Sequence, residues 1–299
     1  MNLIKPKKLK QGDTIAIIAP SGVVNKELIL NAQNYFITKG YKVKLGKNIF
    51  NQNRYLAGTD EERLRDLYSA FEDNSVNAII CARGGYGAIR LANKIDYNIM
   101  KNNPKIFCGY SDITALNALF FTKCGLITFS GPMAQSDFAS TQVDKYTESG
   151  FFNTLTQDYI EILQNSDIIF NPGNAEGILF GGNLATLASL TGVDFIPDKN
   201  FILFAEDLNE PVYKIDRYFT QLLNIDKFRN NVSAIILGEF LDIDNINYFN
   251  EYFEYLSDKL GIPILGGYPI THAKSKCTVP CGAYAKVENN IIKVSNFTV

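Results

Sequence analysis

Short apolar runs that alternate with helical segments are the feature that most constrains the fold of this chain. In the first half, each run is short enough for a buried strand and is followed by a segment with helical spacing. This alternation implies right-handed crossovers and a parallel sheet with helices on both faces, and ligands bind such a sheet beyond the carboxyl ends of its strands. The predicted strands lie at residues 14–20, 42–45, 77–82, 105–109 and 124–132, and the predicted helices at residues 26–39, 56–71, 88–94 and 112–121.

The second half of the chain follows a more polar and less periodic stretch at residues 135–174, which ends in Asn-Pro-Gly-Asn. We therefore place a linker at residues 166–176, between an N-terminal α/β domain of residues 1–165 and a smaller C-terminal α/β domain of residues 177–299. For the C-terminal domain we predict a strand–turn–helix unit at residues 177–191, strands at 200–205, 234–238 and 263–265, helices at 213–223 and 247–260, and a hairpin around Asn289 and Asn290.

Composition excludes several functional classes. The 299 residues are 46% hydrophobic and 20% charged, which suits one large or two ordinary globular domains. A net charge of -2 without long like-charged blocks is not the footprint of a protein that binds nucleic acid or an anionic membrane. No signal-peptide core and no stretch of about 20 apolar residues is present. We therefore expect a soluble, cytoplasmic protein.

The five cysteines suggest reduced thiols, because the count is odd and the chain is long. His272, Cys277 and Cys281 form the one cluster that resembles a zinc site. Their spacing matches no familiar zinc pattern, and no fourth ligand is evident nearby. We predict no metal and no cofactor.

Ser111 lies where a predicted strand passes into a predicted helix, in the segment Gly109-Tyr110-Ser111-Asp112. A serine on such a turn is exposed at the carboxyl end of the sheet, close to the free amides of the first helical turn. This is the arrangement of a nucleophile elbow, although the Gly-x-Ser-x-Gly pattern is absent. The alternative is that Ser111 or Asp112 only caps the helix.

A glycine-rich segment, residues 83–87, follows another predicted strand and would reach the same edge of the sheet. Its Gly85-Tyr86-Gly87 resembles the start of a dinucleotide-binding fingerprint, but Arg90 occupies the third glycine position. Such glycines can instead bring backbone N–H groups close to a reacting oxygen, as an oxyanion hole requires. A third interpretation is a permissive turn without function.

His272 is the only histidine, and it is the one candidate for a general base that titrates near neutral pH. A serine nucleophile needs such a base, and the imidazole needs an acceptor that holds its tautomer. Carboxylates follow two predicted strands of the same half, and the residues alone do not choose among Glu206, Asp207, Glu210 and Glu239.

Four motifs, in order along almost the whole chain, resemble the LD-carboxypeptidase family of serine peptidases. They are Arg83-Gly84-Gly85-Tyr86-Gly87, Gly109-Tyr110-Ser111-Asp112-Ile113-Thr114, Ala205-Glu206-Asp207 with Glu210 and residues 213–217, and Gly267-Tyr268-Pro269 before His272 and Pro280-Cys281-Gly282. The resemblance implies an N-terminal domain that bears the serine, a C-terminal domain that bears the other two catalytic residues, and an active site in the cleft between them.

The resemblance also implies a role for each matched position. Ser111 would be the nucleophile, His272 the general base and then acid, and Glu206 the carboxylate that orients it. The N–H groups of Gly85 and Asp112 would form the oxyanion hole, and Arg83, Gly84 and Tyr86 would bind substrate, with Arg83 near its carboxylate. The chain departs from the family in Thr271, where a glycine commonly precedes the histidine, and in Cys281, where an apolar residue is usual.

On this resemblance we expect a homodimeric serine carboxypeptidase that removes the terminal D-alanine from cytoplasmic murein tetrapeptides in peptidoglycan recycling. A sister branch, the microcin-immunity peptidases, hydrolyses peptidyl or aminoacyl nucleotides with an aromatic residue stacked on the base. The absence of Trp argues mildly against that branch, although Tyr and Phe could substitute. A third hypothesis is a non-catalytic nucleotide- or peptide-binding protein.

Overall fold

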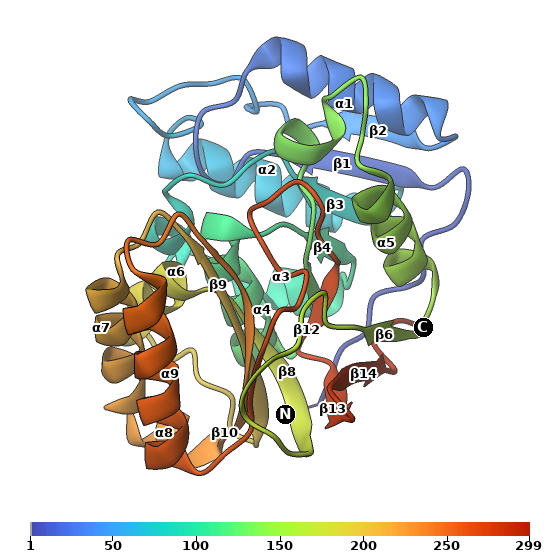
Figure 1. Ribbon diagram of the computed structural model, residues 1–299. Helices are drawn as coiled ribbons and strands as arrows, with labels where there is room; N and C mark the ends of the chain where they lie inside the picture. Colours follow the sequence, from blue (N-terminus) through green and yellow to red (C-terminus); the bar gives the residue numbers. More distant parts are fainter. Residues whose placement is uncertain (1) are drawn as a thin grey trace.

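The computed structural model describes residues 2–299 and arranges them around two β-sheets (Figure 1). In the first sheet the strand order is β12-β5-β4-β3-β1-β2, with β1 to β5 parallel and β12 antiparallel. The expected α/β fold with a parallel N-terminal sheet is confirmed. The strands of this sheet are β1 (Thr14–Ile18), β2 (Lys42–Leu45), β3 (Ala78–Cys81), β4 (Ile106–Cys108), β5 (Thr128–Ser130) and β12 (Val279–Cys281).

Helices connect the parallel strands, as the alternating pattern predicted. The helix at Asp60 begins with a capping box, in which the side chains of Thr59 and Glu62 each bond the other residue's backbone N–H. The predicted helix at residues 88–94 is wrong in length, because the helical turn that begins after Gly87 ends at Leu91, before Asp96 caps the next helix. The helices are α1 (Lys26–Thr38), α2 (Asp60–Glu72), η1 (Ala88–Leu91), α3 (Tyr97–Asn102), η2 (Ser111–Ile113), α4 (Thr114–Cys124), a π-helical turn η3 (Ala134–Phe138) and α5 (Lys145–Thr156).

The second sheet has the order β6-β14-β13-β8-β9-β10-β11-β7, and its four central strands, β8 to β11, are parallel. In Figure 1, helices α7, α8 and α9 lie together along one side of this sheet. The strands are β6 (Tyr159–Ile162), β7 (Ile168–Asn171), β8 (Ala175–Asn183), β9 (Phe201–Leu208), β10 (Val232–Leu241), β11 (Ile264–Gly266), β13 (Tyr284–Glu288) and β14 (Ile291–Ser295). The helices are α6 (Leu184–Ser189), η4 (Leu190–Gly192), α7 (Val212–Leu223), α8 (Asp226–Asn231) and α9 (Ile246–Leu260).

The polar stretch without a clear period contains real elements, namely η3, α5, β6 and β7. Strand β7 lies inside the segment expected to be a linker and pairs with β11 at an edge of the second sheet. Both β6 and β7 are edge strands whose side chains are mostly exposed or half-buried. Apolar and polar residues mix in β6, and the apolar run of β7 is only three residues long. The hairpin around Asn289 and Asn290 is confirmed, and both residues adopt the positive φ of its tight turn. The domain boundaries stay a prediction.

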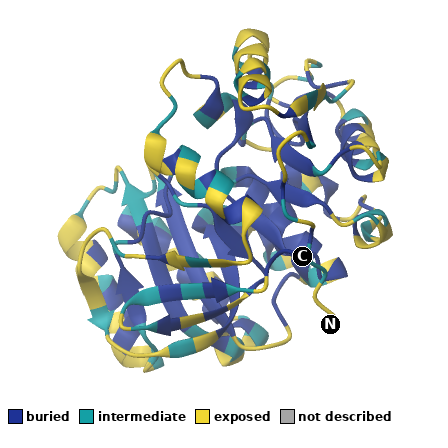
Figure 2. Ribbon diagram, turned by 90° about the vertical axis from the view of Figure 1, so that its right-hand side faces the viewer, coloured by how far each residue is buried: buried dark blue, intermediate teal, exposed yellow. Residues whose placement is uncertain are grey.

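Helix α4 lies between the two sheets (Figure 1) and is buried on nearly every side, which agrees with its apolar sequence. Figure 2 shows that buried residues run through the centre of the molecule. Its Phe121 packs against Phe180 of β8, with ring centroids 6.3 Å apart. Its first residue, Thr114, meets Gly182, where a Cβ atom would lie 2.4 Å from the threonine Oγ1. The helix that follows Ser111 is therefore in direct contact with the second sheet.

Strand β12 returns from the C-terminal half of the chain to the first sheet, where Val279 pairs with Ser130 of β5. In Figure 1, this red strand lies among the blue and green strands of the first half. The loop between β11 and β12, which contains His272, therefore crosses from the second sheet to the first. Within residues 2–299, no helix is both long enough and apolar enough to cross a membrane.

Candidate active site

Ser111 occupies a strained turn between β4 and α4, as predicted. Its φ of 62° lies in the left-handed region, which few residues other than glycine adopt. Such a conformation costs of the order of 1–3 kcal/mol and persists only where surrounding contacts hold it. One such contact is the hydrogen bond from Asn117 Nδ2 to the carbonyl of Gly109, 2.9 Å long and buried. The serine hydroxyl is thus presented at the carboxyl end of the sheet.

The side chain of Asp112 bonds to neighbouring loops instead of capping α4. Its Oδ2 accepts hydrogen bonds from Ser21 Oγ at 2.6 Å and from the backbone N–H of Ala88 at 2.8 Å. In the described part of the chain, neither Ser111 nor Asp112 makes a side-chain cap bond at this helix start. Burial raises the pKa of the Asp112 carboxyl. The capping alternative is therefore wrong, and Asp112 ties together the loops that follow β1, β3 and β4.

The glycine-rich loop after β3 lies directly against Ser111. A Cβ atom built on Gly84 would lie 2.8 Å from Ser111 Cβ and 2.9 Å from its Oγ, closer than real Cβ contacts allow. Gly85 has a φ of 110°, which a residue with a side chain rarely adopts. The carbonyl of Gly84 accepts a hydrogen bond from Gly22 N at 3.2 Å, which joins this loop to the loop after β1. The glycines thus allow backbone to approach the serine hydroxyl.

His272 is hydrogen-bonded to Glu206, a buried residue near the end of β9. Nδ1 of the imidazole and Oε2 of the carboxylate are 2.6 Å apart. Since a carboxylate only accepts, the neutral imidazole carries its proton on Nδ1 and leaves Nε2 with a free lone pair. Burial disfavours the charged ring, but the hydrogen bond and the charge of Glu206 outweigh it and raise the pKa of His272 above 6.5.

The other three carboxylates considered from the sequence have different surroundings. Asp207 is buried and accepts from Asn183 Nδ2 at 2.8 Å, and burial raises its pKa to about 6. Glu210 forms an ion pair with Lys214 at 3.0 Å. Glu239 lines a separate cavity on the second sheet. The geometry therefore assigns the partner of the histidine, a choice that the sequence by itself left open.

Three residues that the sequence analysis did not single out form a series of contacts that begins at the imidazole. Tyr110 packs edge-on against His272, with ring centroids 5.0 Å apart at 74°. Lys276 Nζ lies over the Tyr110 ring, 4.7 Å from its centroid, and forms a buried ion pair with Asp137 of η3. No local pattern marks this pair, because its members are 139 positions apart in the sequence.

The His272 loop is also anchored to α5 of the first half. Thr147 Oγ1 donates a hydrogen bond to the carbonyl of Lys274 at 2.9 Å and accepts one from the backbone N–H of Lys276 at 2.9 Å. Thr147 is only 1% exposed, so both bonds are shielded from water. The histidine is therefore held by both halves of the chain.

Ser111 and His272 line one cavity of about 250 Å³. No hydrogen bond joins the two side chains within residues 2–299, and catalytic hydrogen bonds are often formed only when substrate is bound. The wall also includes η3, which the sequence analysis did not anticipate. The lining residues are Arg83, Gly84, Gly85, Tyr110, Ser111, Met133, Gln135, Ser136 and His272.

Of the residues expected to bind substrate, Arg83 and Gly84 line this cavity, and Tyr86 is absent from its described lining. The guanidinium of Arg83 donates to the carbonyl of Val23 at 3.2 Å. Tyr86 is 47% exposed and packs edge-on against Tyr55, with ring centroids 5.8 Å apart. Tyr86 thus lies on the surface beside the cavity-lining glycines.

Two family models together match most of the chain. Residues 15–131 match the family model described as LD-carboxypeptidase N-terminal domain, and residues 176–287 match its C-terminal counterpart. The chain belongs to the LD-carboxypeptidase family. It is 37% identical to a probable murein peptide carboxypeptidase of Bacillus subtilis, over 94% of this chain and 90% of that protein.

Solved structures represent both branches of the LD-carboxypeptidase family. The crystal structure of an MccF-like protein from Bacillus anthracis superposes with a TM-score of 0.91 at 30% identity, covering 98% of this chain and 99% of that one. The muramoyltetrapeptide carboxypeptidase from Oxalobacter formigenes superposes with a TM-score of 0.86 at 31% identity, covering 96% and 100%. Serine-type carboxypeptidase chemistry is therefore supported at the level of the family.

The two departures from the family pattern have local structural roles. Thr271 Oγ1 accepts a hydrogen bond from Ala273 N at 2.8 Å, which closes a small turn around His272. Cys281 is fully buried in β12, and burial raises its thiol pKa to about 12. With both residues in place, the hydrogen bond between His272 and Glu206 is still formed.

The three residues considered as zinc ligands are engaged separately. His272 bonds Glu206, while Cys277 and Cys281 are thiols whose pKa values burial raises to about 12. In the described chain, no group of three or more His, Cys, Asp or Glu residues is placed to hold a metal ion.

Proposed function

We propose that this protein is a serine carboxypeptidase that hydrolyses the L,D-peptide bond to the terminal D-alanine of murein tetrapeptides. The substrate would be a small soluble peptide in the cytoplasm, produced during cell-wall recycling. No nucleic acid, membrane or cofactor takes part in this proposal.

One observation carries the proposal. A serine in a left-handed turn and a histidine bonded to a buried carboxylate line the same cavity, although they come from different halves of the chain. Nucleophilic acyl transfer requires these groups, namely a nucleophile, a base and an acceptor that orients the base.

In the first chemical step, His272 Nε2 takes the proton of Ser111 as Oγ attacks the carbonyl carbon. The backbone N–H groups of Gly85 and Asp112 would stabilise the oxyanion, and Glu206 would stabilise the imidazolium. The imidazolium then gives its proton to the nitrogen of the departing D-alanine as the peptide bond breaks. In the second step, water attacks the acyl-enzyme with His272 as base, and the serine leaves with a proton from the same ring.

An exopeptidase must also recognise a free carboxylate. Arg83 supports this function, because it lines the cavity that contains Ser111 and carries a cation that can pair with a carboxylate. Gly84 would let the peptide lie close to the serine, and Tyr86, beside the cavity, would contact the remainder of the substrate.

The test is hydrolysis of muramyl tetrapeptide, measured as release of free D-alanine by the wild type and by Ser111→Ala. The wild type is expected to release D-alanine, and folded Ser111→Ala to lose at least about 10³-fold in kcat. Equal release by both would exclude Ser111 as the nucleophile. Binding of the peptide without turnover by the wild type would favour a non-catalytic binding protein.

A microcin-immunity-type hydrolase of peptidyl or aminoacyl nucleotides is the second candidate. It is favoured by the high TM-score with the MccF-like protein of Bacillus anthracis. The chain has no Trp to stack on a base, which supports the murein substrate instead. An aminoacyl sulfamoyl adenosine offered in parallel with the tetrapeptide distinguishes them, because only the preferred class should be hydrolysed in a Ser111-dependent way.

The proposed homodimer is a separate question from the reaction. Light scattering coupled to gel filtration should give a mass near twice the 33.4 kDa of one chain. A mass of one chain at micromolar concentration would contradict it.

A further inference from the structure

Arg63 of α2 is buried and bonds the two loops that follow β1 and β3. It is 1% exposed, and its Nη1 donates to the carbonyl of Pro20 at 2.5 Å and to the carbonyl of Gly87 at 2.8 Å. Pro20 follows β1, and Gly87 closes the glycine-rich segment after β3. One guanidinium therefore connects the loop after β1 to the loop after β3, which lines the active-site cavity.

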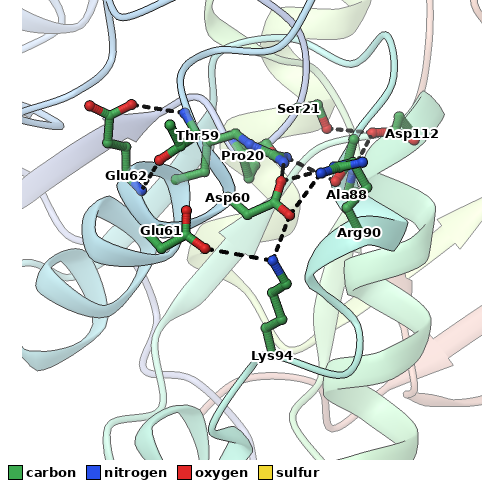
Figure 3. Close-up of polar contacts among 12 residues, drawn as sticks. Pro20, Ser21, Thr59, Asp60, Glu61, Glu62, Ala88, Arg90, Lys94 and Asp112 are labelled. Carbon is green, nitrogen blue, oxygen red and sulfur yellow. Dashed lines mark hydrogen bonds and ion pairs between the residues drawn. The ribbon is translucent and has the colours of Figure 1, made fainter. Parts of the chain in front are cut away.

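Asp60 provides the counter-charge that makes this buried guanidinium tolerable. Figure 3 shows its carboxylate beside Arg90 and Lys94, whose Nε and Nζ donate to it at 2.9 Å and 2.7 Å. Arg63 Nη2 donates to the same carboxylate at 2.5 Å. Burial opposes ionisation of Asp60, but these hydrogen bonds outweigh it and lower its pKa below the ordinary value. The side chains of Arg90 and Lys94 are part-exposed, whereas the buried Arg63 guanidinium also bonds the carbonyls of Pro20 and Gly87.

Asp112 holds the same two loops at a second point. Ser21, next to Pro20, and Ala88, next to Gly87, both donate to its Oδ2 (Figure 3). Arg63 thus bonds one residue of each loop, Pro20 and Gly87, and Asp112 bonds the residue that follows each of them. Asp112 itself follows Ser111, so this network joins the serine turn to both loops.

We propose that Arg63 is a positioning residue for the oxyanion hole, which it serves by fixing the loop that carries Gly85 relative to Ser111. The inference rests on the proposed function, because Gly85 N–H is assigned there as an oxyanion donor. The carbonyl of Gly84 bonds Gly22, and the carbonyl of Gly87 bonds Arg63. Gly85 is one of the two residues between these fixed points, so the two bonds limit how far it can move. Oxyanion donors act through preorganisation, so a donor that must reorient during the reaction loses much of its effect.

Space around Gly87 supports this role. Gly87 has a φ of 133°, and a Cβ atom there would lie 2.8 Å from Arg63 Nη1 and 2.6 Å from Leu56 Cδ2. The loop is therefore packed onto the guanidinium itself, with no room for a side chain between them. A shift of the guanidinium would be transmitted to the Gly87 peptide.

The experiment compares Arg63→Met and Arg63→Lys with a matched control, Arg90→Met. The control removes another cation from Asp60, and the hydrogen bonds of the Arg90 guanidinium in residues 2–299 go to Asp60 and not to either loop. The first readout is the rate at which a fluorophosphonate probe labels Ser111, because this adduct needs the oxyanion hole but no peptide specificity. The second is kcat and KM for muramyl tetrapeptide.

We expect Arg63→Met to label Ser111 about 100-fold more slowly, the effect of losing one oxyanion donor. Its kcat should fall by a similar factor with KM little changed. Arg63→Lys, which keeps the charge and part of the hydrogen bonding, should lose about 10-fold, and Arg90→Met less than about 2-fold. If the Arg63 variants only melted at lower temperature, with labelling rate and kcat unchanged, Arg63 would have a structural role and would not position the oxyanion hole.

A folded Arg63→Met that labels Ser111 at the wild-type rate would overturn the inference, as would an equal loss in Arg90→Met. If Arg63→Met does not fold, a wild-type labelling rate in folded Arg63→Lys would overturn it. Wild-type protein that is labelled at Ser111 but releases no D-alanine would refute the proposed substrate while leaving the Arg63 comparison valid. Wild-type protein that is not labelled would refute both.

Discussion

At the scale of single residues, the site depends on backbone conformations that few side chains tolerate. Ser111 is held at positive φ, and Gly84 lies so close that a Cβ atom would contact the serine side chain. His272 keeps the tautomer that its bond to Glu206 imposes. Changes to Glu206 and to Gly84 test these contacts.

The first concerns Glu206→Gln and the pH dependence of kcat/KM. The base must be neutral, and Glu206 raises the pKa of His272, so wild-type activity should rise with pH through a midpoint above 6.5. Without the carboxylate charge, burial lowers that pKa, and the acidic limb should move to lower pH. The maximal rate should fall on the order of 10⁴-fold, because the amide permits the wrong tautomer. If the acidic limb of the pH profile of kcat/KM did not move, a group other than His272 would control it.

The same shift affects stability. Because the folded-state pKa of His272 exceeds its unfolded value, the pair with Glu206 stabilises the fold below about pH 6.5. This contribution is lost as pH rises through the folded-state pKa. Urea unfolding of wild type and Glu206→Gln should therefore differ more at pH 5.5 than at pH 8.

The second prediction concerns Gly84→Ala. The added methyl group would lie 2.8 Å from Ser111 Cβ, so either the loop or the serine turn must move. We expect a loss of about 1–3 kcal/mol in the free energy of unfolding and at least a 100-fold slower reaction of Ser111 with a fluorophosphonate. Gly150→Ala is the control, because nothing lies within 4 Å of its Cβ position. Normal labelling of Gly84→Ala would argue against close packing here.

At the scale of elements, the active site is an assembly of strand ends and one long loop. The loops after β1, β3 and β4 meet at Asp112 and Arg63, and the β11–β12 loop brings His272 to them. The π-helical turn η3 supplies part of the cavity wall and the aspartate that pairs with Lys276. Loop placement therefore depends on contacts between elements far apart in the chain.

Lys276→Met tests the coupling between η3 and the histidine loop. Removing one member of a buried ion pair should cost about 3–5 kcal/mol, because Asp137 is left buried and charged. Adding Asp137→Asn removes that charge. The asparagine still has a side-chain oxygen that can accept the hydrogen bond from Met133 N, which Asp137 Oδ2 accepts at 2.8 Å in the wild type. Urea unfolding should therefore find the double variant more stable than Lys276→Met. If the double variant instead lost as much free energy of unfolding as the two single substitutions together, the two side chains would not be energetically coupled.

At the scale of the whole molecule, the two sheets are joined by more than a linker. Strand β12 completes the first sheet from the C-terminal half, and the N-terminal Lys8 N bonds the carbonyl of Val299 at 2.9 Å. Helix α4 packs against both sheets, with Phe121 on Phe180. We expect these contacts to make the chain unfold as one cooperative unit.

Hydrogen exchange under native conditions provides the measurement. Strands β3 and β9 lie in the cores of the two sheets. Exchange of their amides should give the same free energy of opening, equal to that of global unfolding. Val279→Ala should lower both values by about 2 kcal/mol, because the buried Val279 of β12 connects the halves. If β9 kept its protection while β3 lost it, the sheets would be separate folding units.

The sequence by itself determined the parallel α/β architecture, most central elements, the elbow at Ser111 and the sole histidine, because strand and helix periodicity and turn chemistry are local. The resemblance of four motifs to one family added the expectation for Glu206. The sequence analysis did not predict the edge strands β6 and β7. Their side chains are largely accessible to solvent, so neither segment has the long apolar run that marks a central strand.

Only the tertiary structure decided what meets at the site. Glu206 is chosen over three other carboxylates because its strand end lies beside the histidine loop. Arg63 and Lys276 look like ordinary surface residues in the sequence, yet each is buried against a partner charge. Their burial depends on loop packing across dozens of residues, and no local pattern encodes such long-range contacts.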